Sequence, residues 1–391
     1  MGSGLELVDR FPLSEKLVYL DTAVMGCVPS STLEAVRVYV EGLLEHMEGG
    51  RPWGFNVEEG VGVRERAEEL FAKVVGAKPN EVVGIPNASL GINTVMGMVP
   101  VEEGENVVST DLVFPMGAAV LARRGEKGAE TRFLRSHGGV VEVEAFEKAV
   151  DDQTSIVYLD QPSWFNGYMF DLEAVAEVCH DHGALLVVDF TQSAGAVEWD
   201  VKKAGVDFAA ASTYKWLLGG MPSMCAGFLY AREEHLEEYQ PDLVSGRSYE
   251  IDKKEGAGPL ADISFKPTHG VRRLSVARVP DVAFVAVENS MKVLLKQGLD
   301  RIEAWNRRLV SRLVDLLAEA GYELQTPLEE ERRTYLNVKV EGLSEVVKTL
   351  NQEGYWCSER VGGIRVSPNF YNTLDHVERF YERLASLAPP S

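Results

Sequence analysis

Two short apolar runs between residues 184 and 220 constrain the fold of this chain more than any other feature. The first run, Leu185–Asp189, ends in an aspartate, and the second, Phe208–Ser212, stops just before Lys215. Both runs have the length and composition of buried parallel strands. If the two strands are neighbours, Asp189 and Lys215 leave the sheet at its carboxyl edge, where α/β enzymes bind ligands.

A carboxylate and a lysine at such an edge suit pyridoxal phosphate. The lysine amine can form a Schiff base with this cofactor, and the acid can hold a proton on the pyridine nitrogen so that the ring accepts electrons. Considered by itself, Lys215 would be an exposed lysine in a strand-to-helix turn, because most lysines are solvated. The spacing from Asp189 and the matches described below favour the cofactor site instead.

Strand-like runs alternate with helical ones over the first two thirds of the chain. The predicted strands are Val82–Ile85, Asn106–Ser109, Thr131–Leu134, Ile156–Leu159, Leu185–Asp189, Phe208–Ser212 and Gly227–Ala231. The predicted helices include Val63–Val75, Val143–Val150 and Leu172–Asp181. An earlier helix would follow Pro29 with Ser30 or Ser31 as its cap, and its apolar face would carry Val36, Val40, Leu43 and Leu44. The alternation indicates an α/β fold with a mostly parallel, doubly wound sheet of seven strands.

Composition narrows the class of protein. The 391 residues carry a formal net charge of −21 and four cysteines. The negative charge argues against a nucleic-acid partner, and the lack of an apolar run of about eighteen residues argues against a membrane span. Scattered cysteines and the lack of a signal-peptide pattern are typical of a cytoplasmic protein. His180 and His182 fit a helix end, so we expect no metal site.

The segments that carry the aspartate and the lysine resemble those of a known family. Asp189-Phe190-Thr191-Gln192, followed by Ser212-Thr213-Tyr214-Lys215, is similar to the motif of the class V aminotransferase group of fold-type I pyridoxal-phosphate enzymes. This group includes cysteine desulfurases, kynureninases, cysteine C–S lyases and small-molecule aminotransferases. The resemblance covers essentially the whole chain. It implies a homodimer, since relatives complete each active site with residues from the partner subunit.

The pattern changes after Pro280. The apolar-periodic stretch Val282–Leu317 predicts one or two long helices. It is followed by predicted strands and helices at Tyr335–Val340, Ser344–Gln352, Gly363–Val366 and Leu374–Ala388. We therefore expect a large cofactor domain over residues 21–274 and a small α+β domain over residues 275–391. The resemblance implies that residues 1–20 pack near the small domain.

The resemblance also assigns contacts with the cofactor phosphate. Asn87–Asn93 follows a predicted strand and opens a predicted helix, a geometry that favours a bound phosphate. A capped helix without a ligand is the alternative for this segment alone. The run is similar to the phosphate loop of the family, with Ala88 and Ser89 on the phosphate-binding pair. Ser212 and Tyr214 match further positions that contact the phosphate in relatives.

Other matches concern the ring and the substrate. Phe114 resembles the aromatic residue that stacks on the pyridine ring, although a buried core phenylalanine is the alternative. Gln192 would hydrogen-bond the phenolic oxygen, and Asn166 lies where family members contact a substrate or cofactor oxygen. Arg365 resembles the arginine that holds the substrate carboxylate in a bidentate ion pair. The alternative for Arg365 is a strand arginine in a surface ion pair.

Local matches favour the kynureninase and C–S lyase side of the family. Arg51-Pro52-Trp53 resembles a kynureninase substrate segment, and Asn166–Asp171 resembles the kynureninase Thr-Gly-x-x-Phe-Asp run. The chain departs from kynureninases at Ser245–Glu250 and Arg273–Arg278, where those enzymes bind the aryl ketone. Cys357 is interpreted as structural rather than as the mobile thiolate of a desulfurase, because buried free cysteines are common.

We therefore expect a pyridoxal-phosphate lyase that acts on an α-amino acid through a Schiff base at Lys215 and breaks a bond at Cβ or to a β-sulfur. A class V aminotransferase or an epimerase of a small amino acid is the alternative. A regulatory protein that binds the cofactor without catalysis is a third possibility. The side chain of the substrate stays open, as does the question of whether Trp164, Arg247 and Arg278 face the pocket.

Overall fold

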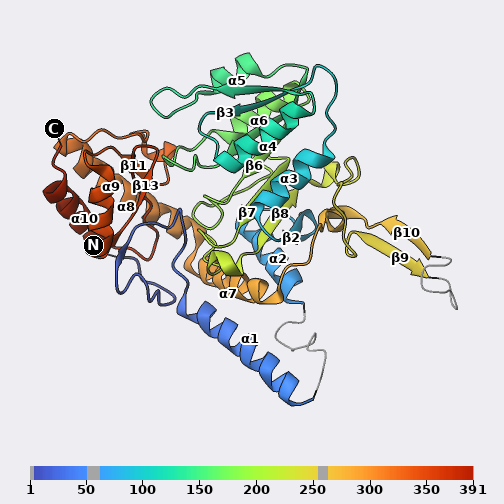
Figure 1. The fold of residues 1–391 in the computed structure, drawn as a ribbon, viewed down its shortest axis with the longest axis horizontal. Coiled ribbons are helices and arrows are strands. Elements are labelled where there is room, and N and C mark those ends of the chain that lie inside the picture. The colour runs from blue at the N-terminus through green and yellow to red at the C-terminus, as the bar shows by residue number, and fades with distance from the viewer. Residues whose placement is uncertain (1–3, 51–61, 254–262, 391) are drawn as a thin grey trace.

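The computed structural model in Figure 1 describes residues 4–50, 62–253 and 263–390. A seven-stranded sheet lies at its centre, with the strand order β2-β8-β7-β6-β5-β3-β4. The strands are β2 (Val82–Ile85), β3 (Asn106–Thr110), β4 (Glu130–Leu134), β5 (Thr154–Asp160), β6 (Leu185–Asp189), β7 (Phe208–Ser212) and β8 (Gly227–Ala231). All neighbours pair in parallel except β8, which is antiparallel to both β2 and β7. The predicted α/β fold is confirmed.

Both faces of this sheet are buried. Along the central strands, successive side chains alternate between two apolar clusters, so that Leu186 and Ala209 lie in one cluster while Leu185 and Phe208 lie in the other. The helices that cover the sheet are α2 (Val63–Val75), α3 (Ala88–Met98), α4 (Pro115–Glu126), α5 (Val143–Ala149) and α6 (Leu172–Asp181). Burial on both faces explains why these strands read as continuous apolar runs.

The helical stretch after Pro280 is two helices, α7 (Asp281–Gln297) and α8 (Leu299–Ala320). Gly298 separates them with a φ of 90°, a conformation that residues with a side chain rarely adopt. The helix α7 packs on α2 and on α1 (Ser30–Glu48), whereas α8 packs on α10 (Leu374–Leu387). None of the helices in the described part of the chain is long and apolar enough to cross a lipid bilayer.

A second, smaller sheet stands among the C-terminal helices (Figure 1). Its order is β11-β14-β13, and both pairings are antiparallel. The elements of this part are β11 (Leu336–Val338), α9 (Leu343–Gln352), β12 (Tyr355–Trp356), β13 (Ser358–Arg360) and β14 (Gly363–Val366). The N-terminal strand β1 (Val18–Tyr19) pairs in parallel with β12. Segments from opposite ends of the chain therefore lie side by side, while the domain boundaries at residues 20 and 274 stay a prediction.

The first helix differs from its prediction. Pro29 is the N-cap of α1 and no side chain caps it, so the expected serine cap is wrong. The Ser31 hydroxyl instead lies within hydrogen-bond distance of two acceptors, Asn289 Oδ1 at 2.8 Å and the carboxylate of Asp9. Val40 is 52% exposed and Leu44 is 56% exposed, so these two side chains lie outside the core, whereas Leu43 on the same helix packs against it.

An antiparallel hairpin was not predicted from the sequence. It consists of β9 (Tyr249–Lys253) and β10 (Ile263–Pro267), and Figure 1 shows it projecting from the body of the molecule. Short 3₁₀ turns occur at Pro79–Glu81, Pro222–Met224, Glu233–His235, Gly270–Leu274 and Glu330–Arg332. The carboxyl ends of β5, β6 and β7, with the start of α3 close by, form the frame of the site described next.

Candidate functional site

A cavity lies at the carboxyl ends of β5, β6 and β7. It is lined by Ala88, Ser89, Phe114, Met116, Asp160, Trp164, Asp189, Thr191, Gln192, Ser212, Tyr214 and Lys215. Every residue that the sequence predicted to contact the cofactor is in this set except Asn166. The strand register explains the convergence, because Asp189 pairs with Ala210 of the next strand and Lys215 follows that strand directly.

The amine of Lys215 shares the cavity with two carboxyl groups and several aromatic rings. Its Nζ is 5.9 Å from the ring centre of Phe114 and 5.8 Å from that of Tyr214. Burial lowers the pKa of Lys215 to about 8, and the charge of Arg365 acts in the same direction, while Asp189 opposes both. A lysine with a pKa close to neutrality can act as a nucleophile and as a base.

Asp160 is a site residue that the sequence analysis missed. It ends β5 in register with Asp189 of β6, so two carboxyl groups stand side by side. Its Oδ1 accepts a hydrogen bond from the Tyr158 hydroxyl at 3.1 Å, and its Oδ2 accepts one from the backbone N–H of Phe114. Burial and the neighbouring Asp189 raise the pKa of Asp160 to about 8. An aspartate at the end of an apolar run, as in Leu185–Asp189, was the signal that could have found it.

Asp189 ionises more readily than Asp160, because the charge of Asp189 raises the pKa of Asp160. It is 8% exposed, and the backbone N–H of Thr191 donates to its Oδ1 at 2.8 Å. Burial raises the pKa of Asp189, while the bonds from Thr191 and the charge of Lys215 oppose that rise. A buried carboxylate with such support can stabilise a positive charge placed against it.

The end of the cavity at α3 favours an anion. Asn87 caps this helix by accepting a hydrogen bond from Leu90 N–H at 2.9 Å. The N–H of Ala88 donates to the Ser212 hydroxyl at 3.0 Å, which ties the start of α3 to the end of β7. The helix dipole, with the Ser89 hydroxyl beside it, makes this end suitable for a phosphate.

Two of the predicted amide side chains already have protein partners. Gln192 lines the cavity, but its Nε2 donates to the Ala23 carbonyl and its Oε1 accepts from the Trp216 indole N–H, each at 3.0 Å. The Nδ2 of Asn166 donates to the carbonyls of Gly139 at 2.8 Å and Gln325 at 3.0 Å. The structure does not bring Asn166 to the cavity, and both side chains hold neighbouring segments in place.

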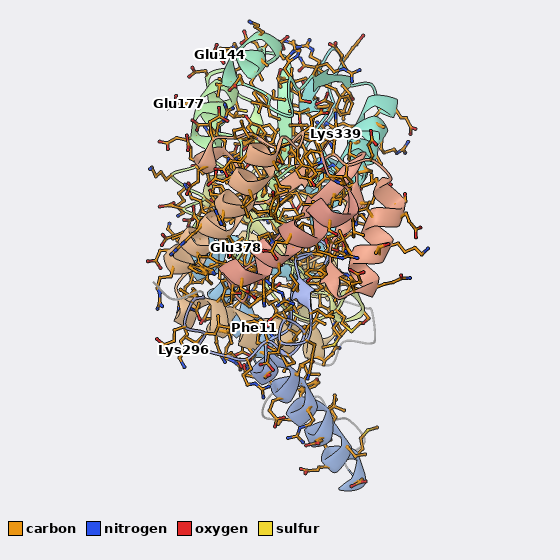
Figure 2. All side chains as sticks on the ribbon, turned by 90° about the vertical axis from the view of Figure 1, so that its left-hand side faces the viewer. Phe11, Glu144, Glu177, Lys296, Lys339 and Glu378 are labelled. Carbon is orange, nitrogen blue, oxygen red and sulfur yellow. The ribbon has the colours of Figure 1, made fainter. Side chains whose placement is uncertain are left out.

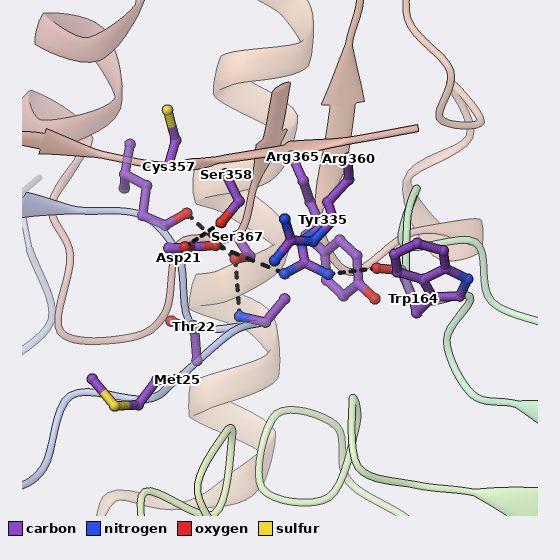
Figure 3. A network of polar contacts seen from close by, with 12 residues as sticks. Asp21, Thr22, Met25, Trp164, Tyr335, Cys357, Ser358, Arg360, Arg365 and Ser367 are labelled. Atoms are coloured by element: carbon purple, nitrogen blue, oxygen red, sulfur yellow. Dashed lines mark hydrogen bonds and ion pairs between the residues drawn. The ribbon is translucent and has the colours of Figure 1, made fainter. Parts of the chain in front are cut away.

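Arg365 reaches this region from β14 and is 2% exposed. Figure 3 shows its guanidinium between Asp21 on one side and Trp164 on the other. The Nη1 donates to the carbonyl of Trp164 at 2.6 Å, and Nη2 lies 3.8 Å from Asp21 Oδ1. The ring of Tyr335 lies 5.9 Å from the guanidinium carbon. The expected alternative, an arginine in a surface ion pair, does not fit this buried position.

Trp164 links Arg365 to the cavity. Its indole N–H donates to the Val113 carbonyl at 3.1 Å, and its ring meets Phe114 edge to face with the ring centres 5.4 Å apart. The pair forms an aromatic wall beside Lys215. Arg247, by contrast, pairs with Glu65 at 2.8 Å on the surface.

The remaining sequence predictions fall outside the cavity. Cys357 is 2% exposed, and burial raises the pKa of its thiol far above its usual value. His180 Nε2 lies 3.0 Å from Asp207, and His182 Nδ1 lies 2.7 Å from Asp152, so the two rings have separate carboxylate partners. The segment Arg51-Pro52-Trp53 lies outside the described residues.

The lining of the cavity fits pyridoxal phosphate. A lysine for the aldehyde, a buried aspartate for the pyridine nitrogen and an aromatic wall for the ring surround one space. The anion-favouring start of α3 faces the same space and suits the phosphate. We therefore infer that these residues would hold the cofactor.

Lys215 in protein freed of cofactor should react with a small aldehyde at a rate that rises with pH and levels off above about 8. The rise follows because only the neutral amine attacks a carbonyl. The rate against pH, followed by absorbance, measures the midpoint. Arg365→Gln should move the midpoint upward by removing a nearby positive charge, whereas Arg379→Gln, at an exposed position on α10, should leave it unchanged. A wild-type midpoint near the unperturbed value of about 10.4 would contradict the burial of the amine.

Comparisons with known proteins identify the family of the chain. The family model described as Aminotransferase class-V matches residues 18–380. An uncharacterized aminotransferase, YcbU, from Bacillus subtilis (strain 168) is 27% identical over 378 residues, which cover 96% of each chain. A probable cysteine desulfurase from Methanothermobacter thermautotrophicus is also 27% identical, with 96% of each chain covered. A kynureninase from Pseudomonas fluorescens is 26% identical over 84% of this chain and 78% of its own.

Solved structures show the same architecture. The apo cysteine desulfurase of Thermococcus onnurineus NA1 has a TM-score of 0.84 at 22% identity, with 99% of each chain covered. The cystine C–S lyase C-DES, solved with its reaction product cysteine persulfide, has a TM-score of 0.85 at 19% identity, with 96% of this chain and 99% of its own covered. The family match over most of the chain shows that this protein belongs to the class-V aminotransferase family and is a pyridoxal-phosphate-dependent enzyme.

Proposed function

We propose that the protein is a pyridoxal-phosphate lyase that acts on an α-amino acid and breaks a bond at Cβ or to a β-sulfur. The observation that carries this proposal is the meeting of Lys215 and Asp189 in one buried cavity, with the guanidinium of Arg365 close enough to lower the pKa of the lysine. When bound, the cofactor supplies an electron sink for the pair of electrons left by a broken bond at Cα.

Each residue has a distinct role in this proposal. Lys215 would hold the cofactor through Nζ and, once released, would accept the proton from Cα of the substrate and return it later. Asp189 would keep a proton on the pyridine nitrogen. Arg365 would bind the α-carboxylate of the substrate and so orient the Cα–H bond. Phe114 and Trp164 would exclude water from the face of the ring.

The remaining cofactor contacts are proposed from the positions of the residues that line the cavity. Ala88 and Ser89 would bind the phosphate at the start of α3, together with the hydroxyl groups of Ser212 and Tyr214. Gln192 would form part of the wall around the cofactor, since both ends of its amide already have protein partners.

The names of the relatives support a lyase over the alternatives. Cysteine desulfurases, kynureninases and a cystine C–S lyase all act at Cβ or at a sulfur attached to it, and they recur among the similar proteins. An aminotransferase is the second candidate, favoured by the similarity to the uncharacterized aminotransferase YcbU. An epimerase or a protein that binds the cofactor without catalysis would appear as distinct outcomes of the experiment below.

We also propose a homodimer. Among the described residues that line the cavity, Lys215 is the one cation, and its amine is assigned to the aldehyde rather than to the phosphate. A positive group from a partner subunit would complete the phosphate site. The helix α1 offers an interface, because large apolar side chains on it are exposed. They are Leu33, Val38, Val40, Leu44 and Met47.

We propose a cytoplasmic location because the cysteines are free thiols. All four are free thiols, and Cys27, Cys179 and Cys357 are buried without forming a disulfide. Free thiols are typical of a reducing compartment. Fractionation of cells that express the protein would test this location.

Titration of the cofactor-loaded protein with cysteine, cystine, kynurenine and simple amino acids should distinguish the reactions. For a lyase we expect a transient change in visible absorbance that reverses as the substrate is consumed. A lasting loss of the lysine-bound absorbance would make the protein an aminotransferase, and racemised substrate would make it an epimerase. Lys215→Ala should reduce turnover by about 10²–10⁴-fold or more. Full turnover and unchanged absorbance in that variant would refute the role of Lys215.

Cys357→Ala should leave sulfur release from the active sulfur amino acid within about twofold of wild type, because the buried thiol has a raised pKa and is not a thiolate nucleophile. The initial rate of sulfide or persulfide release measures this. Cys179→Ala, at an equally buried cysteine on α6, serves as the control for packing loss. A large loss of rate in the Cys357 variant alone would indicate a persulfide relay.

Leu44→Glu should weaken the dimer by at least about tenfold, because it places a charge on the exposed apolar face of α1. Sedimentation velocity over a range of protein concentrations measures the dissociation constant. Leu328→Glu is the matched control, since Leu328 is an exposed leucine (62%) outside that helix. A wild-type protein that stays monomeric at all concentrations would refute the proposal.

A further inference from the structure

The guanidinium of Arg365 has an incomplete set of partners within the described residues. Its Nη1 donates to the Trp164 carbonyl at 2.6 Å, but its buried Nε has no hydrogen-bond partner. The nearest carboxylate, Asp21, is 3.8 Å from Nη2, which is beyond hydrogen-bond distance. A guanidinium can donate five hydrogen bonds, so Arg365 retains donors for a closer acceptor.

Within the described part of the chain, the carboxylate of Asp21 also lacks a hydrogen-bond partner at one of its oxygens. Its Oδ2 accepts a hydrogen bond from the Ser358 hydroxyl, whereas its buried Oδ1, which faces Arg365, has no hydrogen-bond partner among the described residues. The side chain is 3% exposed, so water does not compensate freely. Figure 3 shows Asp21 and Arg365 approaching each other from the N-terminal segment and from β14.

The backbone fixes Asp21 at this position. Asp21 forms a parallel bridge with Ser367, two residues after Arg365, and the Ser367 hydroxyl accepts a hydrogen bond from Ala23 N–H at 3.0 Å. The N-terminal segment therefore carries a carboxylate to the side of Arg365 opposite Trp164. Because these backbone contacts anchor both segments, they set the distance between the carboxylate of Asp21 and the guanidinium of Arg365.

We propose that Asp21 is an internal carboxylate that pairs loosely with Arg365 and gives way when the carboxylate of a substrate binds there. Asp21 is then a positioning residue, which acts through Arg365 and sets how tightly an incoming carboxylate binds. This inference rests on the proposed function only in that it takes Arg365 as the carboxylate site.

The competition should depend on pH. Burial raises the pKa of Asp21 to about 6, and Arg365 is the strongest of the groups that oppose this rise. The titratable or hydrogen-bonding groups that act on Asp21 or are acted on by it are Tyr19, Lys215, Cys357, Ser358, Arg360 and Arg365. Below a pH of about 6, Asp21 is neutral and Arg365 is free to bind an anion. Above that pH, the ionised Asp21 competes for the same guanidinium.

Propionate is a suitable probe, because it has a carboxylate but no amino group to react with the cofactor. Its dissociation constant for the cofactor-loaded protein can be measured by calorimetry between about pH 5.5 and pH 7.5, where it stays ionised. For wild type we expect the constant to rise about tenfold over this range. Asp21→Asn should bind propionate about tenfold more tightly than wild type at the upper pH, with little pH dependence.

Two further variants keep the test decisive. Ser358→Ala removes the hydroxyl that lowers the pKa of Asp21, so the rise in the dissociation constant should move to higher pH without loss of the acid. Glu288→Gln neutralises a buried carboxylate on α7 that pairs with Arg66 at 2.8 Å, and it should bind propionate as wild type does. Arg365→Gln should lose propionate binding at every pH.

The outcomes separate this inference from the proposed function. If Asp21→Asn binds propionate more weakly than wild type, or keeps the wild-type pH dependence, Asp21 does not compete and the inference is overturned. The inference is equally overturned if propionate binding does not need Arg365. If propionate binding follows the expected pattern but no amino acid is consumed, the competition stands and the lyase proposal fails.

Discussion

The in-register parallel pairing of β5, β6 and β7 is the constraint on which the rest of the site depends. Asp160 pairs with Asp189, and Asp189 with Ala210, so the strands end at one level and their next residues share one space. A shift by one residue in either pairing would turn Asp189 toward the opposite face of the sheet. The apolar clusters on both faces stabilise this register, because each strand side chain belongs to one cluster and therefore to one face of the sheet.

Burial gives these groups their chemistry. The chain carries a net charge of −21, yet the cavity keeps two carboxyl groups and one amine away from water. Burial raises the pKa values of Asp160 and Asp189 and lowers that of Lys215, so the three pKa values move toward one another. The pKa values of Asp160 and Lys215 both lie at about 8, so these two groups exchange protons readily near neutral pH, which suits repeated transfer of a proton at Cα.

The two ends of the chain complete the site. Gly26 N–H donates to the carbonyl of Tyr214 at 2.9 Å, and a Cβ at Gly26 would lie 2.1 Å from the carbonyl oxygen of Lys215. Only glycine allows the N-terminal segment to pass so close to the lysine. The same segment brings Asp21 to Arg365, as Figure 3 shows. Its strand β1 packs on α10, the helix that carries Glu378 in Figure 2.

The sequence by itself determined the seven strands of the sheet, the α/β class and the positions of Lys215, Asp189 and Phe114, because period and motif are local properties of the chain. Asp160 followed the same pattern and could have been found. Only the tertiary structure decided that Asp21 faces Arg365 and that Trp164 lines the cavity. It also decided that Asn166 is engaged elsewhere and that Val40 and Leu44 on α1 are exposed. These facts depend on contacts between residues far apart in the chain, and no spacing along the sequence encodes the distance between two folded segments.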